Sequence, residues 1–225
     1  MARGRFIAIE GTDGSGKATQ AALLARALRK QGKRVHSIAF PQHGKPSAAP
    51  VDAYLTGAFG TPQEFGIYQA AMLYAVDRAA AKRDLDSWLK NGDVVIADRY
   101  VASNWAFGGA QLPTHAHRVR YWEWGNELEY SFFGIPKPDV TVVLAVDPGV
   151  ANRLVLQKKS RAYLKGKKRD QYEQNARLQR RVLETYFELT QFDPTMRVVS
   201  CTKGNGILSR SEIHRRVMEA IRKFV

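Results

Sequence analysis

Cysteine is nearly absent from this chain, because Cys201 is the only one among its 225 residues. One thiol cannot form a disulfide within the chain, which favours a reducing compartment. No apolar run approaches the ~18 residues that a membrane-spanning helix needs. The first ten residues hold only the short apolar run 6–9, which is too short for a signal-peptide core. We therefore expect a soluble, cytoplasmic protein that does not bind a membrane.

Acidic residues are also scarce, with 21 Asp and Glu against 35 Lys and Arg, for a net charge of +14. Such a charge admits nucleic acid, anionic membranes or small phosphorylated ligands as partners. No helix-turn-helix signature, zinc-finger spacing or RNP-type aromatic motif accompanies it, so nucleic acid is not the expected partner. The densest basic cluster, 158–169, is either a solvated basic face, a nonspecific RNA patch or a flap over phosphates.

Apolar segments alternate with helical patterns along the whole chain. The strand-like segments are rich in Val and Ile, which is typical of strands buried on both faces of a parallel sheet; they are 5–10, 34–40, 94–97, 140–146 and 196–200. The helical patterns cover 17–31, 64–89, 114–133, 148–157, 170–191 and 209–224. Gly32 is placed as a helix C-cap residue and Asp147 as an N-cap.

This alternation predicts a fold class and a domain organisation. Strand and helix in turn give a doubly wound α/β fold, with about five parallel strands and helices on both faces. The chain contains no internal repeat, no low-complexity segment and no linker. We expect residues 1–225 to form one domain.

A phosphate-binding loop follows the first predicted strand directly. Residues 11–17 read G-x-x-x-x-G-K, and a helical pattern follows them. Glycines let the backbone N–H groups converge on an anion at the positive end of that helix, while Lys17 supplies a charge for the β- and γ-phosphates. The sequence therefore predicts a site for ATP, made of Gly11, Thr12, Asp13, Gly14, Ser15, Gly16, Lys17, Ala18 and Thr19.

Ala18 departs from the usual pattern, which has Ser or Thr after the lysine to bind Mg²⁺ through a hydroxyl. Thr19 points about 100° away on a helix and cannot simply replace that ligand. Mg²⁺ binds largely through phosphate oxygens and water, so we expect weaker metal binding with an extra water in the vacant position.

The third predicted strand ends in Asp98 and Arg99. Ligands of open α/β sheets bind at the carboxyl ends of the strands. A carboxylate there can hold Mg²⁺, and the planar arginine can grip a phosphate. The alternative is a surface turn with a local ion pair.

Five ordered segments together resemble one family, the thymidylate (dTMP) kinases of the nucleoside monophosphate kinase group of P-loop proteins. They are EGTDGSGKATQ, FPQHGKPSAAPVDAYLTG, MLYAVDRA, DRYVASNWAFGGA and the end of the basic cluster, RDQYEQN. The resemblance runs from Phe6 to about Thr190. It implies phosphoryl transfer from ATP to dTMP, with Mg²⁺ as cofactor, in a P-loop kinase fold.

The resemblance also assigns substrate-binding residues. Asp13 matches the carboxylate that holds the 3′-hydroxyl and the region of the acceptor phosphate, and it is also a candidate Mg²⁺ ligand with Asp98. Phe40 and Pro41 match a stiff loop beside the base, and Tyr74 stands where the family usually has a Phe stacked on thymine.

Further positions carry over in the same way. Arg78 matches the arginine that reaches the thymine carbonyl, and Arg99 matches the one that grips the acceptor phosphate. Ser103 and Asn104 match a polar pair near the base edge. Phe107 matches a ring beside the sugar that would exclude a ribose 2′-hydroxyl, although core packing is an equal alternative. His43 stands where the family varies between basic and aromatic residues near the acceptor phosphate, so little weight is given to it.

The basic cluster is then interpreted as a lid, about 158–172, that closes over ATP. Gly14 stands where one subgroup has a catalytic arginine, so Arg161 and Arg169 are the first candidates to replace its charge. Asp170 and Glu173 match acidic groups near the phosphates, with helix capping as the alternative. The resemblance also implies a homodimer formed by helix packing, and the aromatic segment 121–124 is either core or dimer surface.

The implied mechanism is direct in-line transfer without a general base, because the acceptor phosphate is already anionic. Mg²⁺, Lys17, Arg99 and the lid arginines Arg161 and Arg169 are expected to neutralise the charge of the aligned phosphates, and Asp13 is the remaining candidate catalytic residue. Two alternatives stay open: a kinase for another monophosphate such as dUMP, and a weakly active P-loop protein that binds nucleic acid through its basic flap.

Restoring the missing hydroxyl tests the interpretation of Ala18. We expect Ala18→Ser to bind Mg·ATP more tightly than the parent, because the hydroxyl replaces a water in the coordination shell. Titration of Mg²⁺ at fixed ATP measures this. An unchanged affinity would contradict it.

Overall fold

The computed structural model describes residues 3–147, 149–151, 176–204 and 206–225. Its centre is a five-stranded parallel sheet in the order β2-β3-β1-β4-β5, formed by β1 (Arg5–Gly11), β2 (Val35–Ala39), β3 (Val94–Asp98), β4 (Val140–Ala145) and β5 (Met196–Ser200). All six residues of β4 are buried. The predicted doubly wound α/β fold is confirmed.

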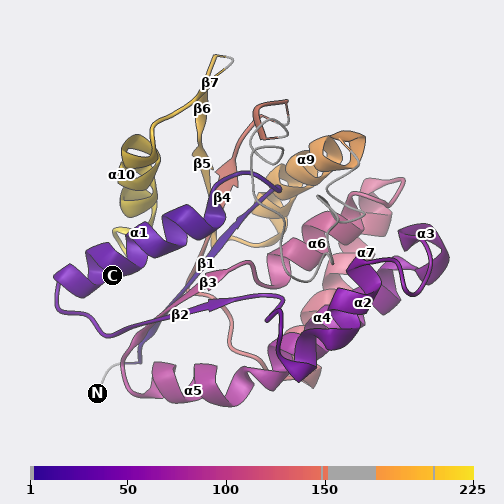
Figure 1. The fold of residues 1–225 in the computed structure, drawn as a ribbon, viewed down its shortest axis with the longest axis horizontal. Helices are drawn as coiled ribbons and strands as arrows, with labels where there is room; N and C mark the ends of the chain where they lie inside the picture. The colour runs from indigo at the N-terminus through magenta and orange to yellow at the C-terminus, as the bar shows by residue number, and fades with distance from the viewer. Residues whose placement is uncertain (1–2, 148, 152–175, 205) are drawn as a thin grey trace.

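Successive residues of β1 face opposite layers of helices. Ile7 and Ile9 pack in one core with α1 (Lys17–Lys30) and α10 (Arg210–Ile221). Phe6 and Ala8 pack in the other core, with α5 (Lys82–Lys90), α6 (Val101–Gly109), α7 (His115–Asn126) and α9 (Ala176–Phe192). Figure 1 shows α1 and α10 on one side of the sheet and α6, α7 and α9 on the other.

The predicted helix 64–89 is wrong as a single element. The structure has α3 (Pro62–Phe65), α4 (Ile67–Ala80) and α5 there. Gly66, at φ 92°, separates α3 from α4, because that backbone conformation is outside the helical range. Thr61 and Glu64 form a capping box at the start of α3. The helix therefore begins at its own N-cap and ends at Gly66.

The predicted helix 114–133 also divides, into α7 and the π-helical turn η2 (Glu127–Phe132). Five further elements were not predicted: the 3₁₀ turn η1 (Pro46–Ala48), α2 (Ala49–Leu55), α6, and the strands β6 (Thr202–Lys203) and β7 (Gly206–Ile207), which form a hairpin. Helix α6 packs so closely on α7 that a Cβ on Gly108 would lie 2.2 Å from the Tyr121 hydroxyl.

The two predicted caps are confirmed. Gly32 has φ 79° just after α1, where a left-handed residue ends a helix. The Asp147 carboxylate accepts hydrogen bonds from the N–H groups of Gly149 and Val150, at 2.9 and 3.2 Å. The rest of the predicted helix 148–157, the predicted lid and the start of 170–191 lie outside the described residues. No described helix is long and apolar enough to cross a membrane.

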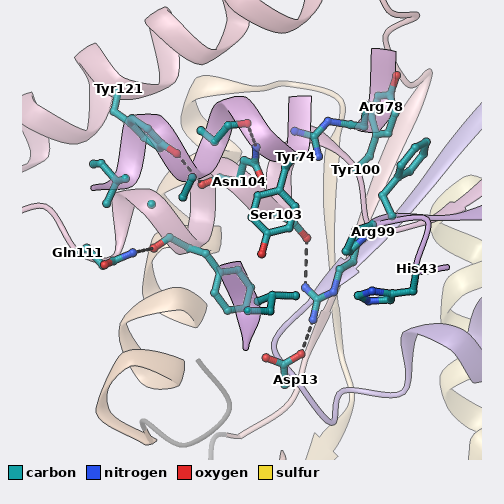
Figure 2. Close-up of a pocket in the computed structure, with 18 residues that line it drawn as sticks. Asp13, His43, Tyr74, Arg78, Arg99, Tyr100, Ser103, Asn104, Gln111 and Tyr121 are labelled. Carbon is teal, nitrogen blue, oxygen red and sulfur yellow. Dashed lines mark hydrogen bonds and ion pairs between the residues drawn. The ribbon is translucent and has the colours of Figure 1, made fainter. Parts of the chain in front are cut away.

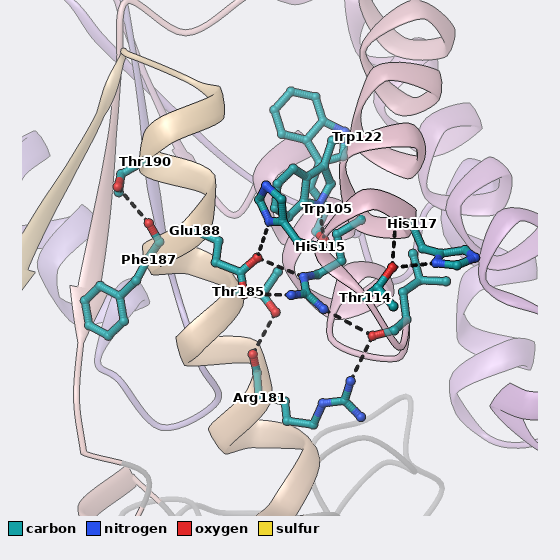
Figure 3. A network of polar contacts seen from close by, with 12 residues as sticks. Trp105, Thr114, His115, His117, Trp122, Arg181, Thr185, Phe187, Glu188 and Thr190 are labelled. Atoms are coloured by element: carbon teal, nitrogen blue, oxygen red, sulfur yellow. Dashed lines mark hydrogen bonds and ion pairs between the residues drawn. The ribbon is translucent and has the colours of Figure 1, made fainter.

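A polar network fixes α9 against the connection between α6 and α7 (Figure 3). Glu188 accepts two hydrogen bonds from Arg118, at 2.9 and 3.0 Å, and one contact from His115 at 2.9 Å. Arg118 and Arg181 both donate to the Leu112 carbonyl. Partial burial opposes the charge of Glu188, but these hydrogen bonds outweigh it and lower the pKa of its carboxyl. The network matters because α9 carries side chains into the site.

Candidate active site

The phosphate loop lies between β1 and the start of α1, as predicted. Gly11, at φ 143°, approaches its neighbours so closely that a Cβ there would lie 2.7 Å from the Leu144 carbonyl oxygen. Gly16 has φ 89° and forms the N-cap of α1 without a side-chain hydrogen bond, so no side chain caps the first N–H groups of that helix. An anion at this end of α1 would meet both the loop amides and the helix dipole.

Lys17 is buried beneath the loop. Its Nζ donates hydrogen bonds to the carbonyl oxygens of Gly11 and Thr12, at 3.0 and 2.8 Å. Burial, and next the positive charge of Arg99, lower the pKa of Lys17 to about 7, although Asp13 and other carboxylates oppose this. The charged form of Lys17 is therefore disfavoured, and the negative charge of a nucleotide phosphate would stabilise it.

Arg99 connects β3 to α6 and is the one non-glycine residue of the described ranges with a positive φ, at 67°. Its guanidinium forms an ion pair with Asp13 and donates to the Ser103 hydroxyl at 3.2 Å. It also lies 5.4 Å from the centre of the Phe107 ring. Burial opposes its charge, but Asp13 outweighs it and the pKa of Arg99 is raised, so the group is cationic at every working pH.

Asp13 is held from two sides, since Gln179 of α9 contacts it as well. Gln179 Nε2 donates to Asp13 Oδ2 at 2.9 Å, and Asp13 N donates to Gln179 Oε1 at 3.2 Å. The Asp13 carboxylate is therefore fixed between Arg99 and α9. Sequence reasoning did not find Gln179.

Glu10, also missed, anchors this arrangement from inside the core. Its Oε1 accepts the N–H groups of Tyr100 and Ser103, at 2.7 and 3.2 Å. Its Oε2 accepts the hydroxyls of Ser103 and Tyr186, at 2.5 and 2.9 Å. Burial raises the pKa of this carboxyl despite those donors. A charged residue directly after the apolar run 6–9 was the available signal for it.

One pocket lies beside the phosphate loop (Figure 2). Every predicted substrate-binding residue in the described part of the chain lines it: Asp13, Phe40, Pro41, Tyr74, Arg78, Arg99, Ser103, Asn104 and Phe107. His43 lines it too and contacts Asp52 at 2.5 Å. Apolar side chains such as Leu55 and Ile67 complete the wall. The pocket thus offers an apolar slot with a few charged and polar groups, a combination typical of small-ligand sites.

The pocket wall at 40–47 is held by Asp77, which the sequence analysis did not single out. Its carboxylate accepts the Gln42 N–H at 2.8 Å and the Ser47 hydroxyl at 2.6 Å. The peptide bond between Phe40 and Pro41 is cis. Because Asp77 precedes Arg78 on α4, one helix positions both the Phe-Pro loop and the arginine of the pocket.

Arg78 and Glu129 form a buried ion pair farther along the wall. Arg78 Nε donates to Glu129 Oε2 at 3.0 Å, and its Nη2 contacts Oε1. Asn104 Nδ2 donates to the Ala71 carbonyl at 3.2 Å, and Tyr121 donates to the Asn104 carbonyl. The polar groups at this end of the pocket are therefore held in place by hydrogen bonds to neighbouring elements.

The comparisons agree with this geometry. The profile of a family described as thymidylate kinase matches residues 9–211. The chain belongs to the thymidylate kinase family. It is 40% identical to the thymidylate kinase of Mycobacterium tuberculosis over 186 residues, which are 82% of this chain and 85% of that one.

Two further relatives extend the match to nearly the whole chain. The probable thymidylate kinase of Pyrococcus abyssi is 28% identical over 221 residues, which are 98% of this chain and 97% of that one. The solved structure of the Candida albicans thymidylate kinase, described as revealing an origin of broad substrate specificity, superposes with a TM-score of 0.71. It is 26% identical and covers 99% of this chain and 93% of its own.

Among the described residues, Asp98 is a predicted site residue that does not line the pocket. Asp98 ends β3 and exerts its charge on Lys17 and Arg99. Arg161, Arg169, Asp170 and Glu173 lie outside the described residues, so their predicted roles stay predictions. Ala18 and Thr19 are both exposed at the start of α1.

The lowered pKa of Lys17 leads to a testable coupling between nucleotide and proton. The polyphosphate favours the charged amine, so binding should take up close to one proton at about pH 8, and little at about pH 6, where Lys17 is already charged. Affinity should fall by up to about tenfold per pH unit above 7. Calorimetric titration of ATP in buffers of different ionisation enthalpy measures the uptake.

Lys17→Arg is the matched control for that titration, because a guanidinium stays charged throughout the range. Its proton uptake should be absent. Equal uptake by the parent and this variant would assign the proton to another group.

Proposed function

We propose that this protein transfers the γ-phosphoryl group of ATP to dTMP, giving dTDP and ADP. The observation that carries the proposal is the joining of two sites: a phosphate loop with Lys17, and a pocket lined by Arg99, which is ion-paired to Asp13 of that same loop. A nucleotide in the loop and a monophosphate in the pocket would place their phosphates side by side. The family membership supports the same reaction.

The reaction needs alignment and charge neutralisation more than it needs acid–base chemistry. An oxygen of the acceptor phosphate forms a bond to the γ-phosphorus, and the bond to the β–γ bridging oxygen breaks, with its electron pair leaving on ADP. Lys17 offsets the charge on the donor, and Arg99 orients the acceptor phosphate against it. Asp13 and Gln179 hold Arg99 and the loop in register for this step.

The far part of the pocket fits a pyrimidine. Tyr74 and Phe40 offer aromatic faces beside it, and Arg78 offers N–H donors for a base carbonyl. Phe107 lies against Arg99, where the sugar of a bound monophosphate would come, and its ring would then exclude a 2′-hydroxyl. We assign the pocket to a deoxypyrimidine monophosphate on these grounds.

Mg²⁺ belongs to this proposal as the partner of ATP. The carboxylates of Asp98 and Asp13 have the hard oxygen chemistry that the ion prefers, and both exert their charge on Lys17. Among the described residues no group of three or more His, Cys, Asp or Glu could hold a metal. When bound, Mg²⁺ would neutralise charge on the transferred group.

A comparison of acceptors tests the function. We expect ADP release from Mg·ATP chiefly with dTMP, among dTMP, dUMP, UMP, dCMP, dGMP, thymidine and no acceptor. Similar rates with dUMP would keep the reaction and change the substrate, since one methyl group is worth only about 10- to 200-fold. ADP release that no acceptor stimulates, together with salt-sensitive binding to long RNA or DNA, would favour the nucleic-acid alternative.

The same assay applied to Arg99→Ala tests the role of this residue in the site. Turnover with dTMP should fall by about 10³-fold, because the group that orients and neutralises the acceptor phosphate is lost. The melting temperature should stay nearly unchanged, since alanine keeps the backbone and the removed pair is partly exposed. Activity near the parent level would overturn the assignment of Arg99.

The proposal includes a homodimer formed through α4. Tyr68, Met72 and Val76 lie four residues apart on that helix and are 41%, 48% and 47% exposed. This spacing places three large apolar side chains in one exposed stripe, which a second copy would cover. The helix carries Tyr74 and Arg78 as well, so the interface would support the base pocket.

We further infer that the whole chain is one kinase domain in the cytoplasm.

Met72→Glu tests the dimer, because a carboxylate in the centre of the stripe would be buried without a partner. We expect the parent to sediment as a dimer and the variant as a monomer at micromolar concentration. Phe187→Glu, at a similarly exposed position on α9, is the matched control and should remain dimeric. A monomeric parent would contradict the interface.

A further inference from the structure

The buried pair of Arg78 and Glu129 has a geometry that bears on base selection. The two side chains come from different elements, α4 and the π-helical turn η2, and each is 2% exposed. Glu129 takes both Nε and Nη2 of the guanidinium. A carboxylate that binds two nitrogens of a planar fork fixes both the position and the plane of the group.

This arrangement leaves one nitrogen of Arg78 for the pocket. Nη1 has no hydrogen-bond acceptor within the described residues. It is also absent from the fully buried polar atoms that lack a partner, so it remains accessible from the pocket. Arg78 lines the pocket, where Figure 2 shows it well away from Asp13. Since a guanidinium has N–H donors and no acceptor, the group presented to a bound base is a donor held in one orientation.

We propose that Glu129 is a positioning residue that fixes Arg78 as a donor to the 4-oxygen of the base, and thereby selects 4-keto over 4-amino pyrimidines. The inference rests on the proposed deoxypyrimidine pocket. A 4-amino group would bring its own N–H against Nη1, leaving two donors face to face and unpaired in a buried site. Without Glu129, the arginine could turn away from that clash and the selection would weaken.

Glu129 is itself firmly held, as a positioning residue must be. Its backbone carbonyl accepts the Ile135 N–H at 3.1 Å, which fixes the end of the π-helical turn. Single π turns occur often at functional sites, where they re-aim a side chain. In this chain the turn lies directly after α7 and directs one carboxylate to the buried arginine of α4.

The test changes Glu129 and the 4-oxygen of the base separately and together, and compares the resulting losses in kcat/KM. The parent and Glu129→Gln are assayed with dTMP, with a 5-methyl-2-pyrimidinone deoxynucleotide that lacks the 4-oxygen together with the N3 hydrogen, and with dCMP. The loss of the N3 hydrogen is common to both enzymes, so the difference between them isolates the contact of Arg78 with the 4-oxygen. In the parent, removal of the 4-oxygen should lower kcat/KM by about 10- to 100-fold, the range for a hydrogen bond to a charged group. In the variant this loss should shrink to a few-fold, because the glutamine amide meets the arginine donor to donor.

The kinetic constants separate positioning from damage to the fold. Glu129→Gln should raise KM for dTMP by about tenfold while kcat stays within about twofold, and it should raise the relative rate with dCMP. Glu188→Gln is the matched control: it removes a carboxylate from the arginine network of α9, so it should lower the melting temperature and leave the 4-oxygen penalty unchanged.

Glu129→Asp keeps the negative charge beside Arg78 and serves where the glutamine variant does not fold. It should shift the same penalty in the same direction, because its carboxylate is one methylene shorter. A penalty present in the parent and unchanged in the variants would overturn the role of Glu129 alone. A parent with no penalty would overturn the assigned base pocket as well.

Discussion

The Glu10 carboxylate, sealed under the phosphate loop, joins the parts of this site. It sits at the end of the central strand and receives hydrogen bonds from two backbone N–H groups at the start of α6 and from two hydroxyls, one of them on α9. A buried carboxylate is tolerated only when such donors offset its desolvation. The sheet, the connection that carries Arg99, and the helix that carries Gln179 are thereby held at one point.

The two arginines of the pocket are held differently, and the difference follows the groups that they would meet. Arg99 and Asp13 have side chains that are 20% and 11% exposed, so their ion pair can exchange partners when a phosphate arrives. The side chains of Arg78 and Glu129 are each only 2% exposed, so this ion pair is buried. Under the proposed function, the adaptable pair would meet a phosphate and the rigid pair would meet a base edge. This matches a reaction in which the phosphate must change geometry and the base must not.

The sequence predicted the sheet and the phosphate loop because both are local patterns: short Val/Ile-rich runs, and a glycine spacing between a strand and a helix. The pocket residues came from the resemblance to a family, and the structure gathers those that it describes around one cavity. The supporting residues escaped prediction because their partners are distant in the chain. Gln179 is 166 residues from Asp13, and Tyr186 is 176 from Glu10. The division of 64–89 was missed because its periodicity continues across Gly66, whose φ no apolar pattern reveals.

The left-handed backbone of Arg99 sets a limit on how stable this protein can become. A non-glycine residue held there costs on the order of 1–3 kcal/mol, and the neighbouring hydrogen bonds of Tyr100 and Ser103 to Glu10 keep it in place. Glycine would relieve that strain but would remove the guanidinium. Selection for heat resistance alone would therefore favour losing this side chain, so under the role proposed for Arg99 catalysis and stability are opposed at this position.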